Sequence, residues 1–463
     1  MLRIFNSLSR KVEDFTPLNP PHVGMYTCGP TVYHFAHIGN FRTYLASDIL
    51  VRTLKFNKYE VEYVMNLTDV GHLTGDNAGD ADTGEDRMEK AAAKEGKTAW
   101  EVAKFYTDAF LEDYKSLNLT PPDHLVRATD HIKEQIALVQ MLDEKGYTYQ
   151  TSDGIYFDTS KFKDYGKLSD LDEIKEGARI EVNPEKRNPR DFALWKFSPA
   201  HEKRQMEWQS PWGVGFPGWH IECSAMSMKY LGETLDIHAG GMDLKQTHHP
   251  NEIAQSEAAT GKEFARYWMH VAFILVQGER MSKSVGNVYR VYDLIKKGYH
   301  PMSLRYLYLQ THYRKELNFT FPSLDAAENA LMKLYTEVAK WDGPSGNVPT
   351  FESRFIDAIN DDLNTAEALA AMWELVKSDY PMSAKMTTLL KMDEVLGLEI
   401  GKSAALIREN TGIIPKEVAE LVKEREHLRK NRKFSAADHV RAQIKKLGYE
   451  VEDSEKGPKV KKI

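Results

Sequence analysis

Residues 28–40, CGPTVYHFAHIGN, combine a cysteine, a Gly-Pro turn, two histidines and a second glycine turn. The stretch that leads into them, 22–29 (HVGMYTCG), is typical of a buried strand that ends in a glycine. Residues 41–55 have helical spacing, and residues 59–66 (YEVEYVMN) indicate a second strand. A strand, a turn, a helix and a strand in this order favour a parallel sheet with crossover helices, which is a Rossmann-like α/β domain.

The middle of the chain interrupts this alternation. Residues 183–196 are rich in proline and charge, and residues 210–220 (SPWGVGFPGWH) are dense in Gly, Pro and Trp, so we expect an α+β insertion over 118–215. The α/β pattern then resumes, and the chain is helical after residue 323. Helices are expected at 85–117, 130–145, 220–231, 249–260, 324–341, 351–378, 382–395, 415–433 and 435–448, and further strands within 124–159 and at 234–241 and 268–277.

The composition is that of a globular protein without a membrane span. Apolar residues make up 42% and charged residues 28% of the 463 residues, which is enough apolar material for a core. The longest apolar runs are far shorter than the roughly 20 residues of a membrane helix, and the N-terminus lacks the apolar region of a secretory signal. Cys28 and Cys223 form no disulfide framework, so we expect reduced thiols in a cytoplasmic protein.

Charge is unevenly distributed along the chain. The net charge is −7, yet residues 401–463 hold 16 Lys and Arg against 10 Asp and Glu, a local excess of +6 that leaves −13 for residues 1–400. A basic tail on an acidic body indicates a polyanionic partner, although a merely solvated helical tail has the same composition.

Two cysteines and a helix that carries histidine and glutamate could form a metal site. Cys28 ends a strand, and Cys223 lies on the helix that follows GFPGW. His248 and Glu252 are four residues apart and share a helix face, while His249 is three residues from Glu252 and would also serve. Two thiolates, an imidazole and a carboxylate suit zinc, but no spacing matches a zinc finger. The alternative is that both cysteines are small buried core residues.

The HIGN turn could bind an anion. The sequence contains no P-loop, and no G-x-G-x-x-G follows an expected strand, so neither a P-loop nor a dinucleotide fingerprint applies. HIGN, however, follows a strand and opens a helix, so the backbone N–H groups of Gly39 and Asn40 favour a negative charge. His37 could donate a hydrogen bond to a phosphate oxygen. An ordinary strand-to-helix turn is the alternative.

Two further segments have the composition of nucleotide-binding loops. Residues 278–287 (GERMSKSVGN) set Arg280 and Lys283 among hydroxyl groups, which suits a loop that closes over phosphate charge. Residues 236–244 (DIHAGGMDL) end a strand in two glycines followed by Asp243, whose carboxylate could bind a ribose or an ammonium group. An exposed basic turn and a plain strand-to-helix turn are the alternatives.

Together these motifs resemble those of the class I aminoacyl-tRNA synthetases. HIGN is similar to the HIGH motif of that class and RMSKS to its KMSKS loop, and they stand in the same order with a long insertion between them. Further strings sharpen the resemblance to the cysteinyl-tRNA synthetases over nearly the whole chain: CGPTVYHFAHIGN, NLTDV, PGWHIECSAM, DIHAGGMDL, HHPNEIAQSEA, HYRKELNF and the tail FSAADHVRAQIKKLGYEVEDSEKG.

The resemblance implies roles for individual residues. Its zinc ligands fall on Cys28, Cys223, His248 and Glu252, and so on His248 rather than His249. The implied catalytic residues are His37, Asn40, Arg280 and Lys283. The implied ATP contacts are Gly39, Gly241, Asp243, Met281, Ser282 and Ser284, and the implied cysteine contacts are Cys28, Gly29, Thr68, Trp219 and His238.

The implied activity is that of a cysteine–tRNA ligase. Such an enzyme activates L-cysteine with ATP and Mg²⁺ to cysteinyl-adenylate and transfers it to the 3′-terminal ribose of tRNA(Cys), at the 2′-hydroxyl in class I. One zinc ion per chain would select cysteine by its thiolate, since a serine hydroxyl does not deprotonate readily on the metal. The resemblance also implies a monomer.

The resemblance also divides the chain into domains. The implied domains are a catalytic domain split over 1–117 and 216–295, the insertion 118–215, a stem-contact segment 296–322, a tRNA-binding helical bundle 323–400, and a C-terminal α/β anticodon-binding domain 401–463.

Three departures from the family pattern stand out. Asn40 replaces the last histidine of HIGH, Arg280 replaces the first lysine of KMSKS, and residues 69–86 are longer and more acidic than the corresponding stretch. One alternative function is an ATP-dependent ligase that joins cysteine to a small amine, as in the mycothiol pathway, but such enzymes lack the C-terminal tRNA-binding part. The other is a synthetase-like protein that binds tRNA or zinc without catalysis, which the presence of His37 and Lys283 opposes.

Overall fold

The computed structural model describes residues 1–74, 82–169, 183–199, 204–281, 286–411, 414–454 and 457–463. The chain forms two compact units. The first consists of Met1–Pro301, Thr311–Phe319 and Asn360–Leu363, and the second of Met302–Gln310, Thr320–Ile359 and Asn364–Ile463. Within the described ranges, no helix has the length and apolar character that crossing a membrane requires.

A five-stranded sheet, parallel throughout, forms the centre of the first unit. Its strand order is β12-β11-β3-β4-β5, and every neighbouring pair is parallel. The strands are β3 (His22–Thr27), β4 (Glu60–Leu67), β5 (His124–Arg127), β11 (Leu235–Gly241) and β12 (Ala265–Val271). This sheet confirms the expected Rossmann-like fold. The chain extends the sheet from β3 first to β4 and later, on the other side, with β11, and ligands bind at the carboxyl ends of strands at such a switch point.

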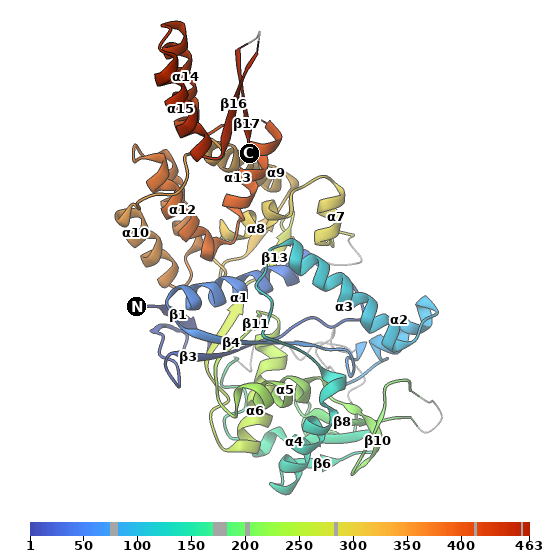
Figure 1. Ribbon diagram of the computed structural model, residues 1–463. Helices are drawn as coiled ribbons and strands as arrows, with labels where there is room; N and C mark the ends of the chain where they lie inside the picture. The colour runs from blue at the N-terminus through green and yellow to red at the C-terminus, as the bar shows by residue number, and fades with distance from the viewer. Residues whose placement is uncertain (75–81, 170–182, 200–203, 282–285, 412–413, 455–456) are drawn as a thin grey trace. The chain divides into compact units, whose positions relative to one another are not determined.

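Helices cover both faces of this sheet (Figure 1). Helix α1 (Ile38–Phe56) lies on one face, and α5 (Trp219–Leu231) and α6 (Leu244–Thr260) lie on the other. Met25, Tyr63 and Ile237 on the strands between them are fully buried. Beyond β3 the backbone N–H of Cys28 still donates to Ala239 O at 3.0 Å, so the ends of β3 and β11 stay side by side.

The segment 118–215 builds a second sheet, antiparallel and also of five strands. It contributes β5 to the parallel sheet, then forms α4 (Ile132–Glu144) and the strands of the second sheet, whose order is β6-β7-β8-β10-β9. These strands are β6 (Thr148–Gln150), β7 (Gly154–Phe157), β8 (Phe192–Phe197), β9 (Trp208–Ser210) and β10 (Gly213–Pro217). Phe157 and Trp195 of this sheet share an apolar core with Leu138 of α4, Ile221 of α5 and Ala254 of α6, so the insertion packs directly on helices that cover the parallel sheet.

The remaining strands and α-helices complete the first unit. They are β1 (Arg3–Asn6), β2 (Lys11–Asp14), α2 (Arg87–Glu95), α3 (Ala99–Ser116), β13 (Ile274–Val276), β14 (Glu279–Arg280), α7 (Val291–Lys296) and β15 (Leu317–Phe319). β1 pairs with β2, and β13 lies between β14 and β15 in a small mixed sheet.

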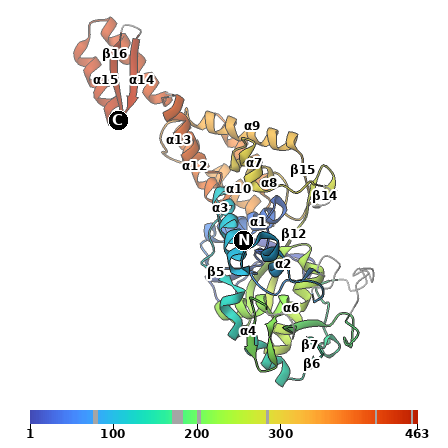
Figure 2. The same cartoon turned by 90° about the vertical axis from the view of Figure 1, so that its right-hand side faces the viewer.

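The second unit is helical and ends in a small α/β module. Its helices are α8 (Pro301–Leu309), α9 (Phe321–Val338), α10 (Pro349–Asn360), α11 (Thr365–Lys377), α12 (Met382–Leu396) and α13 (Ile400–Thr411). The module consists of α14 (Lys416–Lys430), α15 (Phe434–Lys446) and the hairpin of β16 (Tyr449–Ser454) and β17 (Gly457–Lys462). Figure 2 shows β16 beside the two helices, and Val440, Ile444 and Val451 form their shared core.

Two expected helices are each broken in two. The helix expected at 85–117 ends at Gly96, which has a positive φ of 65°, and restarts at the N-cap Thr98. The helix expected at 351–378 is interrupted at Asp362 and Leu363, both with φ of 55°. A left-handed residue cannot continue an α-helix, so each break has a local cause.

Two other expected elements have different bounds. The strand expected at 268–277 is divided into β12 and β13. Helix α6 begins at Leu244 rather than at 249, which places Pro250 inside the helix, where it removes one backbone hydrogen bond.

Arg42 on α1 holds the first unit together from inside. Its side chain is buried, and Nη1 donates to Ala272 O at 2.9 Å and to Phe273 O at 2.7 Å. Nη2 donates to the carbonyls of His312, at 3.2 Å, and Lys315. One guanidinium therefore satisfies carbonyl groups on two segments that are distant in the sequence.

Replacing Arg42 with methionine should destabilise the protein strongly. The buried carbonyls would lose a charged donor, so R42M is expected to lower the free energy of unfolding by about 3 kcal/mol in urea unfolding followed by circular dichroism. The control is R354M, which removes a surface arginine that pairs with Glu374 and should cost much less. Equal losses in the two variants would contradict the role given to Arg42.

Candidate active site

A cavity of about 280 Å³ lies at the switch point, where β3 and β11 end. The predicted site residues that line it are Cys28, Gly29, His37, Asn40, Trp219, Gly241 and Asp243. Residues that the sequence did not single out complete the wall, among them Tyr33, His34, His72 and Arg87. The cavity thus joins the end of β3, the HIGN turn and the double-glycine end of β11 in one site.

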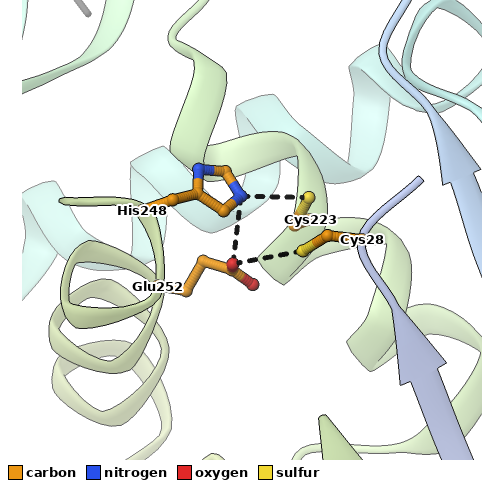
Figure 3. Close-up of side chains that lie close together, drawn as sticks. All are labelled: Cys28, Cys223, His248 and Glu252. Carbon is orange, nitrogen blue, oxygen red and sulfur yellow. Dashed lines mark hydrogen bonds and ion pairs between the residues drawn. The ribbon is translucent and has the colours of Figure 1, made fainter. Parts of the chain in front are cut away.

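Four side chains converge in a buried cluster (Figure 3), and one of them, Cys28, lines the cavity. Cys28 follows β3, Cys223 lies on α5, and His248 and Glu252 lie one turn apart on α6. His248 Nε2 is 3.4 Å from Cys223 Sγ and 3.0 Å from Glu252 Oε1, and Cys28 Sγ is 3.8 Å from the same oxygen. All four ligand atoms lie within 4.8 Å of one another, so the group could hold a metal ion.

A second set of ligands overlaps the first. Cys28, His238, His249 and Glu252 also offer atoms within 4.8 Å of one another. His249 Nε2 lies 3.4 Å from Cys28 Sγ. Because the two sets share Cys28 and Glu252, a single ion bound by these two residues could take either His248 or His249 as a further ligand. The distances between the ligand atoms do not decide between the two histidines.

Hydrogen bonds behind the cluster orient these ligands. His248 Nδ1 is 2.9 Å from His220 Nδ1, and burial keeps the pKa of His220 well below its usual range. A neutral His220 accepts the Nδ1 proton of His248, so His248 Nε2 faces Cys223. Glu252 Oε2 is 2.8 Å from His238 Nε2, which leaves Oε1 turned toward the two thiols. Such outer contacts fix the tautomer and direction of metal ligands.

Charges within the cluster are strongly coupled. Burial opposes ionisation of Cys223, but a hydrogen bond from Cys28 and the neighbouring His248 bring its pKa down to about 6. Burial disfavours the charged form of His248, yet Glu252 and Cys223 raise its pKa to about 10. Glu252 has a pKa of about 2, because His238 and His248 outweigh its burial. Burial raises the pKa of Cys28 well above its usual range, so this thiol keeps its proton at neutral pH.

The HIGN turn is built around a histidine that caps its own helix. His37 Nδ1 accepts the backbone N–H of Gly39 at 3.1 Å and of Asn40 at 3.3 Å. Asn40 Oδ1 in turn accepts the backbone N–H of His37 at 3.0 Å, which completes a capping box. Because Nδ1 is used as an acceptor, the neutral ring carries its proton on Nε2, and a histidine that lines the cavity thereby becomes a hydrogen-bond donor.

The segment after β14 approaches this turn. A Cβ atom on Gly39 would lie 2.4 Å from Met281 Cε and 3.0 Å from the His37 ring, so any larger residue would displace the end of the Met281 side chain and crowd His37. The backbone N–H of Ile38 donates to Tyr289 O at 2.9 Å. The described residues on either side of 282–285 therefore both lie against the HIGN turn. Ser282, Lys283 and Ser284 themselves lie outside the described residues.

Several predicted site residues do not line the cavity: Arg280, Thr68 and His238 and, among those described above, Gly39, Met281, Cys223, His248 and Glu252. Arg280 is exposed on β14, with its guanidinium carbon 4.8 Å from the ring centroid of Phe273. Thr68 and His238 are buried. Thr68 Oγ1 accepts from Asn66 Nδ2 at 3.1 Å, and Asn66 Oδ1 accepts the backbone N–H of Gly29 at 2.7 Å. Thr68 therefore positions Gly29 of the cavity wall indirectly, through Asn66.

Aromatic rings lead from the cluster to Arg87. Trp219 lies 4.3 Å from His248 between ring centroids and 4.6 Å from His72, and His72 lies 5.8 Å from Tyr33. Arg87 Nη1 donates to Tyr33 Oη at 2.5 Å, and its Nε donates to a backbone carbonyl at 3.1 Å. Tyr33 stands inside the CGPTVYHFAHIGN string, but nothing in the spacing of the sequence links it to His72 and Arg87.

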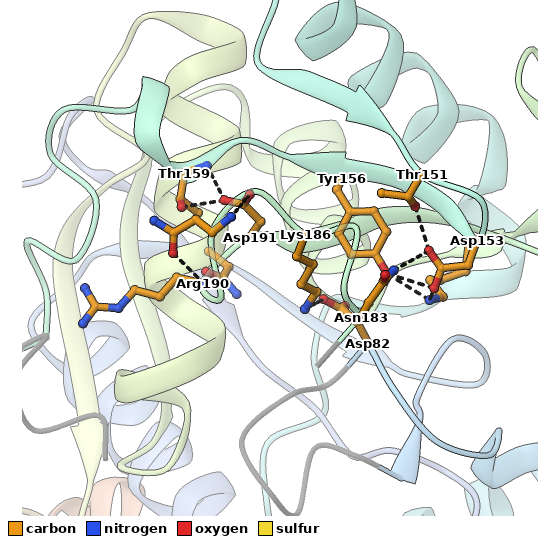
Figure 4. A network of polar contacts seen from close by, with 12 residues as sticks. Asp82, Thr151, Asp153, Tyr156, Thr159, Asn183, Lys186, Arg190 and Asp191 are labelled. Carbon is orange, nitrogen blue, oxygen red and sulfur yellow. Dashed lines mark hydrogen bonds and ion pairs between the residues drawn. The ribbon is translucent and has the colours of Figure 1, made fainter. Parts of the chain in front are cut away.

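The insertion anchors the segment that carries Arg87. Asp86 caps α2 by accepting from Met88 N at 2.7 Å, and it also pairs with Arg204. Asp82 pairs with Lys186 of the insertion at 3.0 Å, and both side chains are almost fully buried (Figure 4). Part of the acidic stretch 69–86 is therefore a connection between the cavity wall and the antiparallel sheet.

Comparison with known proteins identifies relatives along the whole chain. Residues 14–329 match the family model described as tRNA synthetases class I (C) catalytic domain, and residues 354–378 match the DALR domain. The chain is 47% identical over 99% of its length to "Cysteine--tRNA ligase 1" of Burkholderia lata, of which it covers 96%. It is 42% identical to "Cysteine--tRNA ligase" of Treponema denticola, with 98% of each chain covered. Among solved structures, a methionyl-tRNA synthetase of Mycobacterium tuberculosis in complex with methionyl-adenylate shares the fold, with a TM-score of 0.56 at 17% identity over 84% of this chain and 91% of that one.

Metal binding to the cluster should release protons. Cys28 and His248 both carry protons at neutral pH, and both must lose one to act as ligands, so about two protons should leave per ion. The affinity of the cluster for Zn²⁺ should therefore rise with pH, since the metal-free protein binds more protons than the metal-bound protein does. Calorimetric titration of Zn²⁺ into metal-free protein, in buffers of different ionisation enthalpy, measures this number.

The matched variant for this titration is Cys28→Ser. A serine hydroxyl keeps its proton, so this variant should release about one proton fewer per ion. Zn²⁺ binding that releases no protons, or an unchanged count in Cys28→Ser, would contradict the ionisation states derived for the cluster.

Proposed function

Since the chain belongs to the cysteine–tRNA ligase family of class I aminoacyl-tRNA synthetases, we propose that its cavity joins L-cysteine to tRNA(Cys) at the expense of ATP. The observation that supports this most strongly is that one cavity contains both a region suited to a thiol and a region suited to a phosphate. Cys28, with its buried cluster, forms the end suited to a thiol, and His37 on the HIGN turn forms the end suited to a phosphate. Class I ligases must bring these two groups together before any bond forms.

We propose zinc as the metal of the cluster, held by Cys28, Cys223, His248 and Glu252. Two thiols, an imidazole and a carboxylate fit zinc in donor type, and the ligand set that holds both thiols contains His248 rather than His249. A bound zinc ion would supply a soft Lewis acid that takes up the thiolate of cysteine far better than the hydroxyl of serine. No editing site is then needed to reject serine, which differs from cysteine by one atom.

In the first proposed step, a carboxylate oxygen of cysteine attacks the α-phosphorus of ATP. A carboxyl oxygen–phosphorus bond forms, the bond from that phosphorus to the bridging oxygen of the β-phosphate breaks, and pyrophosphate leaves. The Nε2–H of His37 and the N-terminus of α1 would stabilise the charge that develops on the phosphate oxygens. Arg280 and Lys283 would hold the departing pyrophosphate with Mg²⁺, and Asp243 would bind the ribose or the ammonium group.

In the second proposed step, the 2′-hydroxyl of the terminal ribose attacks the carbonyl carbon of cysteinyl-adenylate. The ester bond to tRNA forms, the acyl–oxygen bond to AMP breaks, and AMP leaves with the transferred proton. Positioning and fixed charges would supply most of the rate.

We assign tRNA binding outside the cavity to the second unit. The DALR match at 354–378 and the excess of basic residues over 401–463 support this assignment, and together they disfavour a ligase acting on a small amine. Lys, Arg and His side chains gather in the last turns of α14 and α15, where they suit contacts with RNA phosphates. The predicted domain boundaries, monomeric state and cytoplasmic location stay predictions.

Assays of ATP–pyrophosphate exchange and of tRNA charging distinguish the three candidate functions. The protein should catalyse cysteine-dependent ATP–pyrophosphate exchange without tRNA and should charge tRNA(Cys). Exchange without charging would favour a small-amine ligase, and absence of exchange would contradict both enzyme functions.

Cys223→Ser should lower the zinc content from about one per chain to near zero and should abolish exchange with cysteine. Stoichiometric zinc in this variant would contradict the ligand set.

The contact between Gly39 and Met281 gives a second test. Gly39→Ala should displace the end of the Met281 side chain and crowd the His37 ring, which lies 3.0 Å from the added Cβ, and exchange should fall roughly 100-fold with little loss of stability. The control is Gly343→Ala, at a glycine with nothing within 4 Å of the added Cβ and no positive φ, and it should behave like the wild type. Full activity of Gly39→Ala would show that this contact does not position the loop for catalysis.

A further inference from the structure

Beside the cavity, the loop that carries Tyr33 continues into a surface of aromatic rings and arginines. Phe35 lies two residues after Tyr33, and its ring centroid is 5.8 Å from that of Phe105 on α3. The guanidinium carbon of Arg290, just before α7, lies 4.2 Å from the centroid of Phe35. We call Tyr33, Phe35, Arg87, Phe105 and Arg290 the aromatic–arginine surface.

Neighbouring contacts hold this surface in place. Arg290 Nη2 is 2.7 Å from Asp293 Oδ1, which fixes its guanidinium over Phe35. Tyr106 packs edge-on against Phe35 and donates to Glu95 Oε1 at 2.5 Å. The side chains are therefore ordered before any partner arrives, which lowers the entropy cost of binding.

Two rings of the region remain exposed to solvent despite this packing. Phe105 is 44% exposed, and Tyr292 beside Arg290 is 52% exposed. A cluster of exposed aromatic rings next to a catalytic cavity marks a binding surface. Rings combined with arginine suit single-stranded nucleic acid, because every base has a face that stacks and every nucleotide carries a phosphate.

On the premise of the proposed function, we propose that the aromatic–arginine surface binds the single-stranded 3′ end of tRNA. Phe35 and Phe105 stack on the bases that precede the terminal nucleotide, and Arg87 contacts the phosphate of the terminal nucleotide where it enters the cavity. The premise itself requires the 3′ end to reach this cavity, and the surface is continuous with the cavity wall through Tyr33.

The position of Arg87 favours tRNA over cysteine as its ligand. Cysteine is held by its thiol at the Cys28 end, and the rings of Trp219, His72 and Tyr33 stand in succession between His248 and Arg87. Among the described residues that line the cavity, Arg87 is the one lysine or arginine. A phosphate of the tRNA that enters the cavity would therefore meet the guanidinium of Arg87. Neutralisation of this phosphate by Arg87 would release a counterion from the RNA.

Phe105→Ala and Arg87→Gln test the proposal in two separate assays. Exchange without tRNA reports the first step, and single-turnover transfer from preformed adenylate reports the second. Phe105→Ala should raise the KM for tRNA about tenfold, as loss of one stacked base predicts. Arg87→Gln should slow transfer about tenfold and should reduce the slope of log KM for tRNA against log salt by about 0.7. Phe105→Ala should keep exchange within about twofold of the wild type, and any loss of exchange in Arg87→Gln, which lines the cavity, should be clearly smaller than its loss of transfer.

The control is Trp100→Ala on the same helix. Trp100 is 48% exposed, but it packs against Trp208 rather than Phe35, so its loss should leave both assays unchanged. Thermal melting of each variant checks that the fold is intact.

Two results would overturn the proposal. One is a wild-type KM for tRNA in both variants. The other is an exchange defect in Arg87→Gln as large as its transfer defect, which would assign Arg87 to cysteine or ATP. Failure of the proposed function is distinguishable from these, because it would appear as absence of exchange in the wild-type protein.

Discussion

The buried cluster of Cys28, Cys223, His248 and Glu252 is the constraint on which the active site depends. Each of these side chains is almost inaccessible to water, and three of them ionise readily in that setting. Unpaired charge is costly inside a protein, so β3, α5 and α6 must meet closely enough for the charges to neutralise one another or to bind a cation. The switch point of the parallel sheet is the place where those three elements can meet, and the cavity lies beside the resulting cluster, with Cys28 in its wall.

The HIGN turn shows how one set of residues serves both fold and site. His37 caps α1 with Nδ1, which fixes the tautomer that leaves a donor on Nε2. Asn40 closes the capping box with its amide oxygen, a role that needs an acceptor reaching the backbone of His37. An amide provides this acceptor and keeps a donor on its nitrogen, which gives a physical reason why asparagine can occupy the last position of the motif.

The sequence could predict the elements that local pattern controls. The strands around Cys28, the helix after HIGN and the parallel sheet follow from periodicity and from turn residues. The break at Gly96 carries a sequence signal, a glycine two residues before the N-cap Thr98, whereas a left-handed aspartate such as Asp362 in a helical pattern is visible only in the backbone. The choice between His248 and His249 could not come from spacing, since both reach the face of Glu252. Arg87 and His72 were missed because packing of the insertion, through Lys186 and Arg204, brings their segment to the cavity wall.

The proposed selection of cysteine depends on coordination of its thiolate to the metal. The ligands around the metal therefore test this proposal directly. X-ray absorption at the zinc edge counts the sulfur atoms around the ion in the loaded protein. Addition of L-cysteine should increase the number of sulfur ligands by one, while L-serine should leave the spectrum unchanged. An unchanged spectrum with saturating L-cysteine would contradict thiolate coordination as the basis of selection.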